Sequence, residues 1–149
     1  MNISIIAAED AEAAKGIVLQ GFKERFGVII DGLNPDLDDI MTYYKGENLF
    51  YVGKYQGDLI ATGGLLSESP TEYRVVRMSV SARYRSLGLG KQMLLFLEQE
   101  ARKRNAASMV LETNQEWSDA INFYKRNGYE AFQIEADRIH FRKIFSPGL

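Results

Sequence analysis

The order of helices and strands predicted from the sequence indicates a single α/β domain. The chain has 149 residues, a common size for one domain, and no repeat or Pro- and Gly-rich linker divides it. It contains about seven short segments rich in β-branched and aromatic residues, which favour strands. The segments between them show helical periodicity. We therefore treat residues 1–149 as one domain, with residues 146–149 as a short tail.

The N-terminal third is predicted to contain one strand and two helices. Residues 3–6 favour a strand, and the periodicity that follows predicts a helix over residues 8–22. Its core face is expected to comprise Ile17, Val18 and Phe22. A second helix is expected to begin behind Asn34-Pro35, since Asn is a good helix cap and Pro suits the first turn.

The middle of the chain is predicted to form three consecutive strands. Residues 49–55 and 59–66 read as a hairpin, because Gln56-Gly57-Asp58 between them is typical of a turn. Residues 73–80 then read as a buried strand.

A strongly amphipathic helix is predicted over residues 89–104. Its buried face is expected to comprise Leu94, Leu97 and Ala101. Its exposed face is expected to carry two ion pairs four residues apart, Glu98–Arg102 and Glu100–Arg104. The basic last turn suits the negative end of the helix dipole.

The C-terminal part is predicted to contain three further strands and one helix. Residues 108–113 favour a strand, and a helix over residues 118–127 is expected to end at Gly128, a good left-handed cap residue. Two strands follow around a turn at residues 135–137. The complete order of elements therefore predicts a mixed α/β fold with about four helices.

Composition excludes several classes of function. The chain has no Cys and one His, which argues against disulfides, a zinc cluster or a cysteine nucleophile, so we expect no metal site. A net charge of −2 gives no basic field that would attract nucleic acid. No apolar run reaches the roughly 20 residues that a membrane helix needs, and the acidic N-terminal segment is unlike a signal peptide. We expect a cytoplasmic protein.

One segment has the chemistry of an anion site. The strand over residues 73–80 leads through a basic turn with Gly88 and Gly90 directly into the strong helix. The first turn of a helix leaves N–H groups unpaired and carries partial positive charge, and glycines let a phosphate approach the backbone. Positive side chains in this segment are Arg83, Arg85 and Lys91.

Two common nucleotide motifs do not match this segment. The dinucleotide fingerprint requires a third glycine where the chain has Met93. A P-loop requires Ser or Thr after its Gly-Lys, and here Gln92 follows Lys91. Neither alternative is supported by the residues.

The residues Arg85-x-x-Gly88-x-Gly90 resemble the pyrophosphate-binding motif of the GNAT superfamily of N-acetyltransferases. Ala82, where many members have Pro, and Ser86, often Gly, depart from that motif. A second segment, from Ala120 through Tyr124 to Gly128-Tyr129, resembles the later motif of the same superfamily. The resemblance covers residues from about 49 to the end of the chain.

The resemblance implies a mostly antiparallel sheet of about seven strands, with two neighbouring strands splayed apart near Val80 and Thr113 to hold coenzyme A. It implies acetyl-CoA as co-substrate and transfer of the acetyl group to a primary amine. The implied cofactor-binding residues are Met78, Val80, Arg85, Ser86, Leu87, Gly88, Leu89, Gly90, Lys91 and Asn114. The first two helices would form the groove for the acceptor.

The resemblance also implies a proton donor and leaves the base open. Tyr124 occupies the tyrosine position of the second motif and would protonate the departing CoA thiolate as general acid. A lysine-like amine must lose a proton first, since its pKa is about 10.4. Related proteins often have a Glu where this chain has Arg74, so the candidates for the base are Glu72 and Glu112.

Several residues have two readings. Asn114 resembles an Asn that lies near CoA in some members, and it is equally suited to cap the turn before Ser118. Trp117 stands where many relatives have Asn, which puts that contact in doubt. His140 is expected to be structural. The aromatic residues Phe22, Phe26, Tyr43 and Tyr44 are candidates to line the acceptor groove or to belong to the core.

The acceptor is not defined by the sequence. We expect a small-molecule or peptide amine, no nucleic acid and no membrane, and leave a homodimer as an open alternative. The rival function is a non-catalytic module that senses acyl-CoA. An enzyme that moves a bulkier acyl group is a further alternative.

Overall fold

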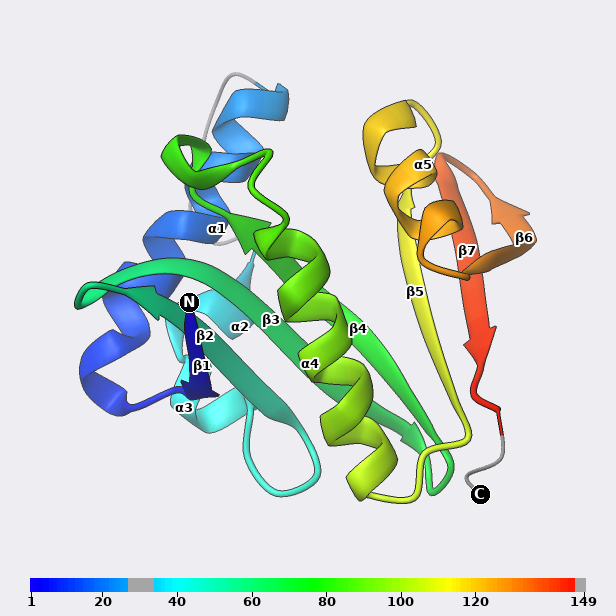
Figure 1. Ribbon diagram of the computed structural model, residues 1–149, viewed down its shortest axis with the longest axis horizontal. Coiled ribbons are helices and arrows are strands. Elements are labelled where there is room, and N and C mark those ends of the chain that lie inside the picture. The colour runs from blue at the N-terminus through cyan, green and yellow to red at the C-terminus, as the bar shows by residue number, and fades with distance from the viewer. Residues whose placement is uncertain (27–33, 147–149) are drawn as a thin grey trace.

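A seven-stranded sheet forms the centre of the computed structural model, which describes residues 1–26 and 34–146 (Figure 1). The strands follow the order β1-β2-β3-β4-β5-β7-β6. Their bounds are β1 Asn2–Ile5, β2 Leu49–Tyr55, β3 Asp58–Ser69, β4 Glu72–Val80, β5 Ser108–Asn114, β6 Glu130–Glu135 and β7 Arg138–Ile144. The α-helices are α1 Ala11–Phe26, α2 Pro35–Asp38, α3 Ile40–Tyr43, α4 Leu89–Lys103 and α5 Ser118–Arg126, with short 3₁₀ turns at Ala8–Asp10 and Ala82–Tyr84.

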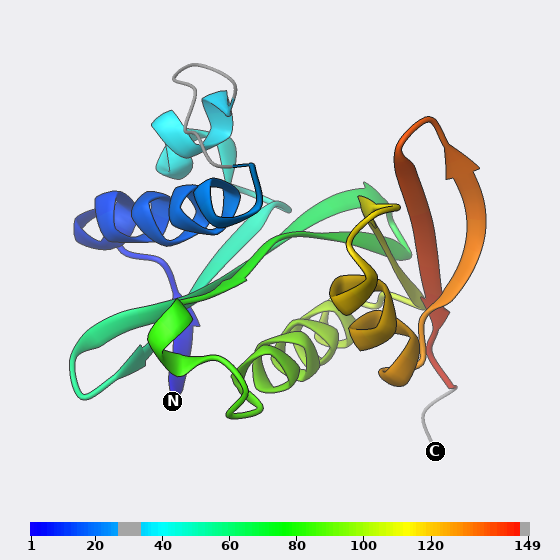
Figure 2. The ribbon, with the colours of Figure 1, turned by 90° about the horizontal axis from the view of Figure 1, so that it is seen from above.

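The helices cover both faces of the sheet. Helices α1, α2 and α3 lie on one face, and α4 and α5 lie on the other (Figure 2). Each face has its own apolar cluster. The cluster beneath α4 includes Leu94, Leu97 and Met109, and the cluster beneath α1 includes Val18, Ile40 and Phe50. One apolar cluster on each face is the expected outcome for a sheet that separates two sets of helices.

Strands β4 and β5 are neighbours in the sheet but pair over only part of their length. Every other neighbouring pair is antiparallel, whereas β4 and β5 are parallel. Their register runs from Glu72↔Ser108 to Arg74↔Val110 and then stops. Beyond this point the two strands diverge, as the open gap between them in Figure 1 shows. The predicted splayed pair is confirmed.

A β-bulge interrupts β4 in the half that pairs with β3 but not with β5. Val76 is paired with Gly64 and Ser79 with Thr62, so Arg77 and Met78 together face the single residue Gly63. Arg77 has a φ of 54°, in the left-handed region that a bulky residue seldom adopts. The bulge reverses the alternation of side chains, as is usual for one extra residue.

Helix α4 confirms most of the sequence prediction and corrects one ion pair. Its face with Leu94, Leu97 and Ala101 is fully buried, and Glu100 pairs with Arg104 at 3.0 Å. The expected Glu98–Arg102 pair is wrong. Glu98 is buried, accepts from the Tyr129 hydroxyl and pairs with the Lys143 ammonium, both at 3.0 Å. Burial of a carboxylate costs free energy unless it is paired and hydrogen-bonded, so the buried partners of Glu98 replace the exposed neighbour on its own helix.

The N-terminal third contains more helices than predicted. The expected second helix is two short ones, α2 and α3, which raises the α-helices in the described residues to five. Pro35 occupies the first turn of α2, but Asn34 makes no side-chain cap. Its amide oxygen accepts instead from the Arg77 guanidinium at 3.2 Å. Helix α1 begins at Ala11 after a 3₁₀ turn and continues to Phe26, beyond the expected end.

Candidate functional site

Two joined cavities occupy the gap between the splayed strands. The larger, with a volume of about 1030 Å³, lies between β4, β5 and helices α1 to α3. The smaller, of about 890 Å³, lies between β4 and the first turns of α4 on one side and α5 on the other. Met78, Val80 and Tyr124 line both cavities. We call the larger cavity the acceptor-side cavity and the smaller one the donor-side cavity, after the groups that the sequence resemblance implies on each side of the cleft.

The glycine turn forms one wall of the donor-side cavity. Gly88 has a φ of 79°, a conformation that glycine adopts without strain, and it is the N-cap residue directly before helix α4. The lining residues from this turn and the helix start are Arg85, Ser86, Gly88, Leu89, Gly90 and Lys91. Leu87 is exposed and does not line the cavity. The backbone of the turn therefore faces a cavity beside a helix start, where partial positive charge gathers.

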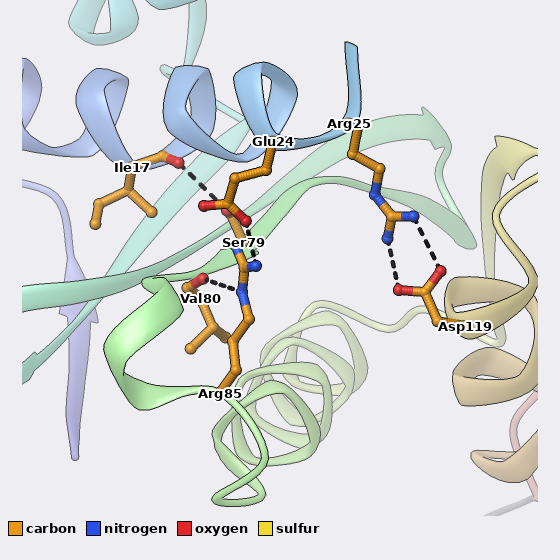
Figure 3. Close-up of polar contacts among 7 residues, drawn as sticks. All are labelled: Ile17, Glu24, Arg25, Ser79, Val80, Arg85 and Asp119. Carbon is orange, nitrogen blue, oxygen red and sulfur yellow. Dashed lines mark hydrogen bonds and ion pairs between the residues drawn. The ribbon is translucent and has the colours of Figure 1, made fainter. Parts of the chain in front are cut away.

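Arg85 does not point its charge into this turn. Its guanidinium donates to the Val80 carbonyl at 3.1 Å and forms an ion pair with Glu24 at the end of α1 (Figure 3). The sequence motif predicts a binding role for Arg85, and the structure assigns its side chain to the junction between α1 and the end of β4. Its backbone still begins the turn.

The unpaired half of β4 offers peptide groups along the cleft. After Arg74, no described residue of β5 is in register with β4 on this edge. The peptide groups around Met78 therefore have the geometry of a free strand edge, which an extended amide-containing ligand can pair with, while the Val80 carbonyl already accepts from Arg85. This is the arrangement that the resemblance implies for pantetheine.

Tyr124 lies where the two cavities meet. Its ring packs among Phe123, Tyr129 and Phe141, with ring centroids 5.1, 5.9 and 6.3 Å away. Its hydroxyl forms no hydrogen bond with another described residue, and burial raises the pKa of Tyr124 to about 12. The hydroxyl therefore keeps its proton at neutral pH and has its hydrogen-bonding capacity unused.

The two candidate bases occupy different places. Glu72 lies at the closed end of the β4–β5 pair, outside the residues that line either cavity. Its carboxylate accepts from the Ser108 hydroxyl at 2.7 Å and from Arg142 at 3.0 Å. Glu112 lines the acceptor-side cavity from β5. The structure thus brings Glu112 to the cleft and leaves Glu72 elsewhere.

Arg74, at the position where related proteins often have Glu, is engaged away from the cleft. It forms an ion pair with Glu68 and lines neither cavity.

An ion-pair network that the sequence did not reveal lines the acceptor-side cavity. Arg77 donates to both oxygens of Asp36, at 2.9 and 2.7 Å, and Tyr44 donates to the same carboxylate at 2.7 Å. Burial opposes ionisation, but the hydrogen bonds from Arg77 and Tyr44 hold the pKa of Asp36 below its usual value. Burial, together with the Asp36 charge, raises the pKa of Tyr44. Asp36 and Arg77 are 41 positions apart in the chain, which hides this pairing from sequence patterns.

The four candidate aromatic residues all line the acceptor-side cavity. They are Phe22, Phe26, Tyr43 and Tyr44. Phe26 and Tyr43 are more than half exposed, whereas Tyr44 is buried against Phe50. The cavity is therefore lined both by exposed aromatic rings and by the Asp36–Arg77 ion pair.

The structure also places Asn114, Trp117 and His140, whose roles the sequence left open or in doubt. The side-chain oxygen of Asn114 accepts from the Glu116 N–H at 2.8 Å, which supports its role in the turn before α5, although it also lines the acceptor-side cavity. Trp117 precedes α5 directly and stacks under the Arg25 guanidinium. His140 lies 3.6 Å from Glu112 and 3.5 Å from Glu135, on β7.

Across residues 1–26 and 34–146, no three His, Asp or Glu side chains gather as metal ligands. Within the same residues, no helix has the length and apolar character that a membrane crossing requires.

Known proteins share this fold. An acetyltransferase of the GNAT family from Staphylococcus aureus Mu50 superposes with a TM-score of 0.86 at 22% identity, covering 96% of this chain and 98% of that one. The PaiA N-acetyltransferase from Thermoplasma acidophilum, solved in complex with coenzyme A, superposes with a TM-score of 0.83 at 18% identity, covering 97% and 100%. These likenesses confirm the predicted fold.

Sequence comparison leads to the same group. A probable N-acetyltransferase 14 from Xenopus tropicalis is 35% identical over 102 residues, which cover 65% of this chain and 48% of that protein. The chain thus spans about half the length of this relative. The model of the acetyltransferase (GNAT) family matches residues 20–129, a range that includes the glycine turn, the splayed strands and Tyr124. This chain belongs to the GNAT family of acetyltransferases.

Proposed function

We propose that the protein is an N-acetyltransferase that moves the acetyl group of acetyl-CoA to a primary amine of a small molecule or peptide, by direct attack on the thioester. Family membership supports acetyl-CoA as the co-substrate. The observation that carries the proposal is the meeting of two cavities at the unpaired half of β4, beside Tyr124. One cavity accommodates the donor, and the other accommodates the acceptor.

The donor-side cavity suits coenzyme A in both charge and shape. The backbone of Ser86 to Lys91 would hold the pyrophosphate at the start of α4, and Lys91 adds a positive charge. The free edge of β4 at Met78 and Val80 would pair with the amides of pantetheine. Leu87 and Arg85 contribute through their backbone rather than their side chains.

The reaction requires two proton movements. The amine nitrogen attacks the thioester carbonyl, the C–S bond breaks, and the thiolate takes a proton while the amine loses one. Tyr124 would donate the first proton, since its hydroxyl is protonated and lies between the cavities. Bulk water can later restore the Tyr124 proton.

Glu112 is the better placed base of the two candidates. It lines the acceptor-side cavity, and its side chain is 42% exposed, so it can hold a relay water. Glu72 forms an ion pair with Arg142. Burial alone would raise the pKa of the Glu72 carboxyl, but the hydrogen bonds from Ser108 and Arg142 lower it below its usual value. A carboxylate held in this way is a weak base.

The rival proposal is an acyl-CoA sensor without turnover. Arg74 in place of the usual Glu motivates it, since a sensor needs the donor-side cavity and no base. An enzyme would show release of free CoA thiol with an amine present, and a sensor would bind acetyl-CoA and release none.

A thermal-shift experiment tests the donor assignment first. Acetyl-CoA at a hundredfold excess over its Kd should stabilise the protein by about 2.7 kcal/mol, whereas NADH and ATP should not. Replacing Gly90 with Leu should abolish the shift, because a Cβ added at this position would lie 3.6 Å from the Phe123 ring, and the rest of the Leu side chain would fill the cavity that Gly90 lines. Absence of a shift with the unmodified protein would contradict the proposal. A screen of primary amines for thiol release then separates the enzyme from the sensor.

A further inference from the structure

The last turn of α1 reaches both walls of the donor-side cavity. Two consecutive residues point to opposite walls (Figure 3). Glu24 forms an ion pair with Arg85, in the turn that follows β4. Arg25 donates two hydrogen bonds, of 2.9 and 2.8 Å, to the two carboxylate oxygens of Asp119 in the first turn of α5. We call these four residues the α1 brace.

The Arg25–Asp119 contact has more support than an ordinary surface ion pair. The Arg25 guanidinium carbon lies 4.4 Å from the centroid of Trp117, and the Phe26 ring lies 5.6 Å from the same ring. Stacking fixes the plane of the guanidinium, and two parallel hydrogen bonds fix its direction. An isolated exposed ion pair, by contrast, has freedom to move and contributes little.

The brace lies where the strands no longer hold each other. The β4–β5 register ends at Arg74↔Val110, so no ladder in the described residues joins the walls at Val80 and α5. Asp119 and Arg85 both line the donor-side and the acceptor-side cavities. The side chains of α1 therefore connect two walls that the sheet leaves apart.

We propose that Arg25 and Asp119 are positioning residues that set the width of the donor-side cavity, with Trp117 as their platform, and so determine the affinity for acetyl-CoA. This inference rests on the proposed function. Loss of either residue lets α5 move away from the end of β4, and the two walls then no longer hold coenzyme A together. Binding weakens, while the chemistry at Tyr124 is largely retained once the co-substrate is bound.

A simple charge effect makes a different prediction. Coenzyme A is an anion, so removing Arg25 would leave the Asp119 carboxylate to repel it, and removing Asp119 would leave Arg25 to attract it. Charge alone therefore predicts opposite changes in affinity for the two variants. Positioning predicts weaker binding in both.

The experiment measures the Kd for coenzyme A by calorimetry in R25A, D119A and the charge-swapped R25D/D119R protein. We expect the Kd to rise about fivefold to tenfold in each single variant, with the swap recovering at least part of the loss. In the acetyl-transfer assay, the KM for acetyl-CoA should rise with little change in kcat. The matched control is D38A, which removes the 2.8 Å contact of Lys15, also on α1, with a carboxylate that lines neither cavity.

The single tryptophan provides a second readout. Trp117 is the one Trp of the chain, so its emission reports on the brace without added labels. Emission should change in R25A and not in D38A, and both proteins should melt within a few degrees of the unmodified one.

Two results overturn the inference while the proposed function stands: unchanged affinity in both single variants of a protein that binds coenzyme A, or opposite shifts of the Kd in R25A and D119A. An unmodified protein that binds no coenzyme A contradicts the proposed function itself, and the inference with it.

Discussion

The two halves of the β4–β5 pair are built in opposite ways. In the closed half, backbone register joins Glu72–Arg74 to Ser108–Val110, and an ion pair from Glu72 to Arg142 adds a third strand. In the open half, the register ends, β4 bulges at Arg77, and two cavities replace the missing neighbour. The same two strands thus form core at one end and line an open cleft at the other.

This difference separates the residues that stabilise the fold from the residues that are available for function. The closed half and the core beside it have their polar groups paired. Glu72 accepts from Ser108 and Arg142. Glu98 of α4 pairs with Tyr129 and with Lys143, which lies opposite Met109 of β5. The open half keeps groups unused, such as the Tyr124 hydroxyl and the edge of β4. Substitutions in the closed half should reduce stability, and substitutions in the open half should reduce activity or binding.

The largest expected effect on the open half comes from Tyr124→Phe. Loss of the proton donor should lower kcat by about 10² to 10³-fold, with the Kd for acetyl-CoA and the melting temperature nearly unchanged. Steady-state kinetics and calorimetry measure this. The matched control is Tyr129→Phe, whose hydroxyl bonds Glu98 and should affect stability more than kcat. Equal losses of kcat in the two variants would contradict the assignment.

The pH dependence of Tyr124 sharpens the same test. Because burial raises its pKa to about 12 from an ordinary value near 10, the folded state favours the protonated form. Its contribution to stability is full below pH 10 and is lost as pH rises toward 12. The rate profile should therefore show no decline that depends on Tyr124 below about pH 10.

The largest expected effect on the closed half comes from Glu98→Ala. Removing one partner of a buried ion pair leaves the Lys143 ammonium without its carboxylate, which should lower the free energy of unfolding by about 3 kcal/mol. Urea unfolding measures the loss. Glu98→Gln, which keeps a hydrogen-bond acceptor for Tyr129, should lose less. An unchanged unfolding midpoint for Glu98→Ala would show that this network does not stabilise the fold.

Glu112→Gln and Glu72→Gln compare the two candidate bases directly. Glu112→Gln should lower kcat/KM about tenfold, less than a directly acting base, because its exposed carboxylate works through water. Glu72→Gln should leave kcat/KM unchanged. A larger loss of activity from Glu72→Gln would reverse the assignment that the cleft geometry supports.

The smallest expected effect is on acid stability. The pKa of Glu72 is lower in the folded protein than in the unfolded chain, so its contribution is present above about pH 4.3 and is lost as pH falls below that value. Glu72→Gln should remove about 0.5–1 kcal/mol at neutral pH, and its stability should fall less on acidification. Thermal melts from pH 7 to pH 3 measure the difference between the two curves, and parallel curves would contradict it.

Sequence patterns predicted those parts of the fold that depend on near neighbours. Turn chemistry and periodicity predicted the hairpin at Gln56-Gly57, the helix that begins after Gly88 and the left-handed glycine at Gly128, and all three are present. The two motifs placed the glycine turn and Tyr124 at one cleft. The family likewise followed from residues at fixed short spacings.

Tertiary structure decided the pairings between distant residues. Local pattern predicted Arg102 for Glu98, but burial selected Lys143, 45 residues away. Local pattern also gave no reason to prefer Glu72 or Glu112 as the candidate base. Only the end of the β4–β5 register distinguishes them, because it leaves Glu72 in the paired half and Glu112 in the open half. The contact between Arg25 and Asp119 spans 94 residues. Periodicity and turn chemistry act over a few residues, whereas the choice of a charged partner depends on which surfaces the folded chain brings together and removes from water.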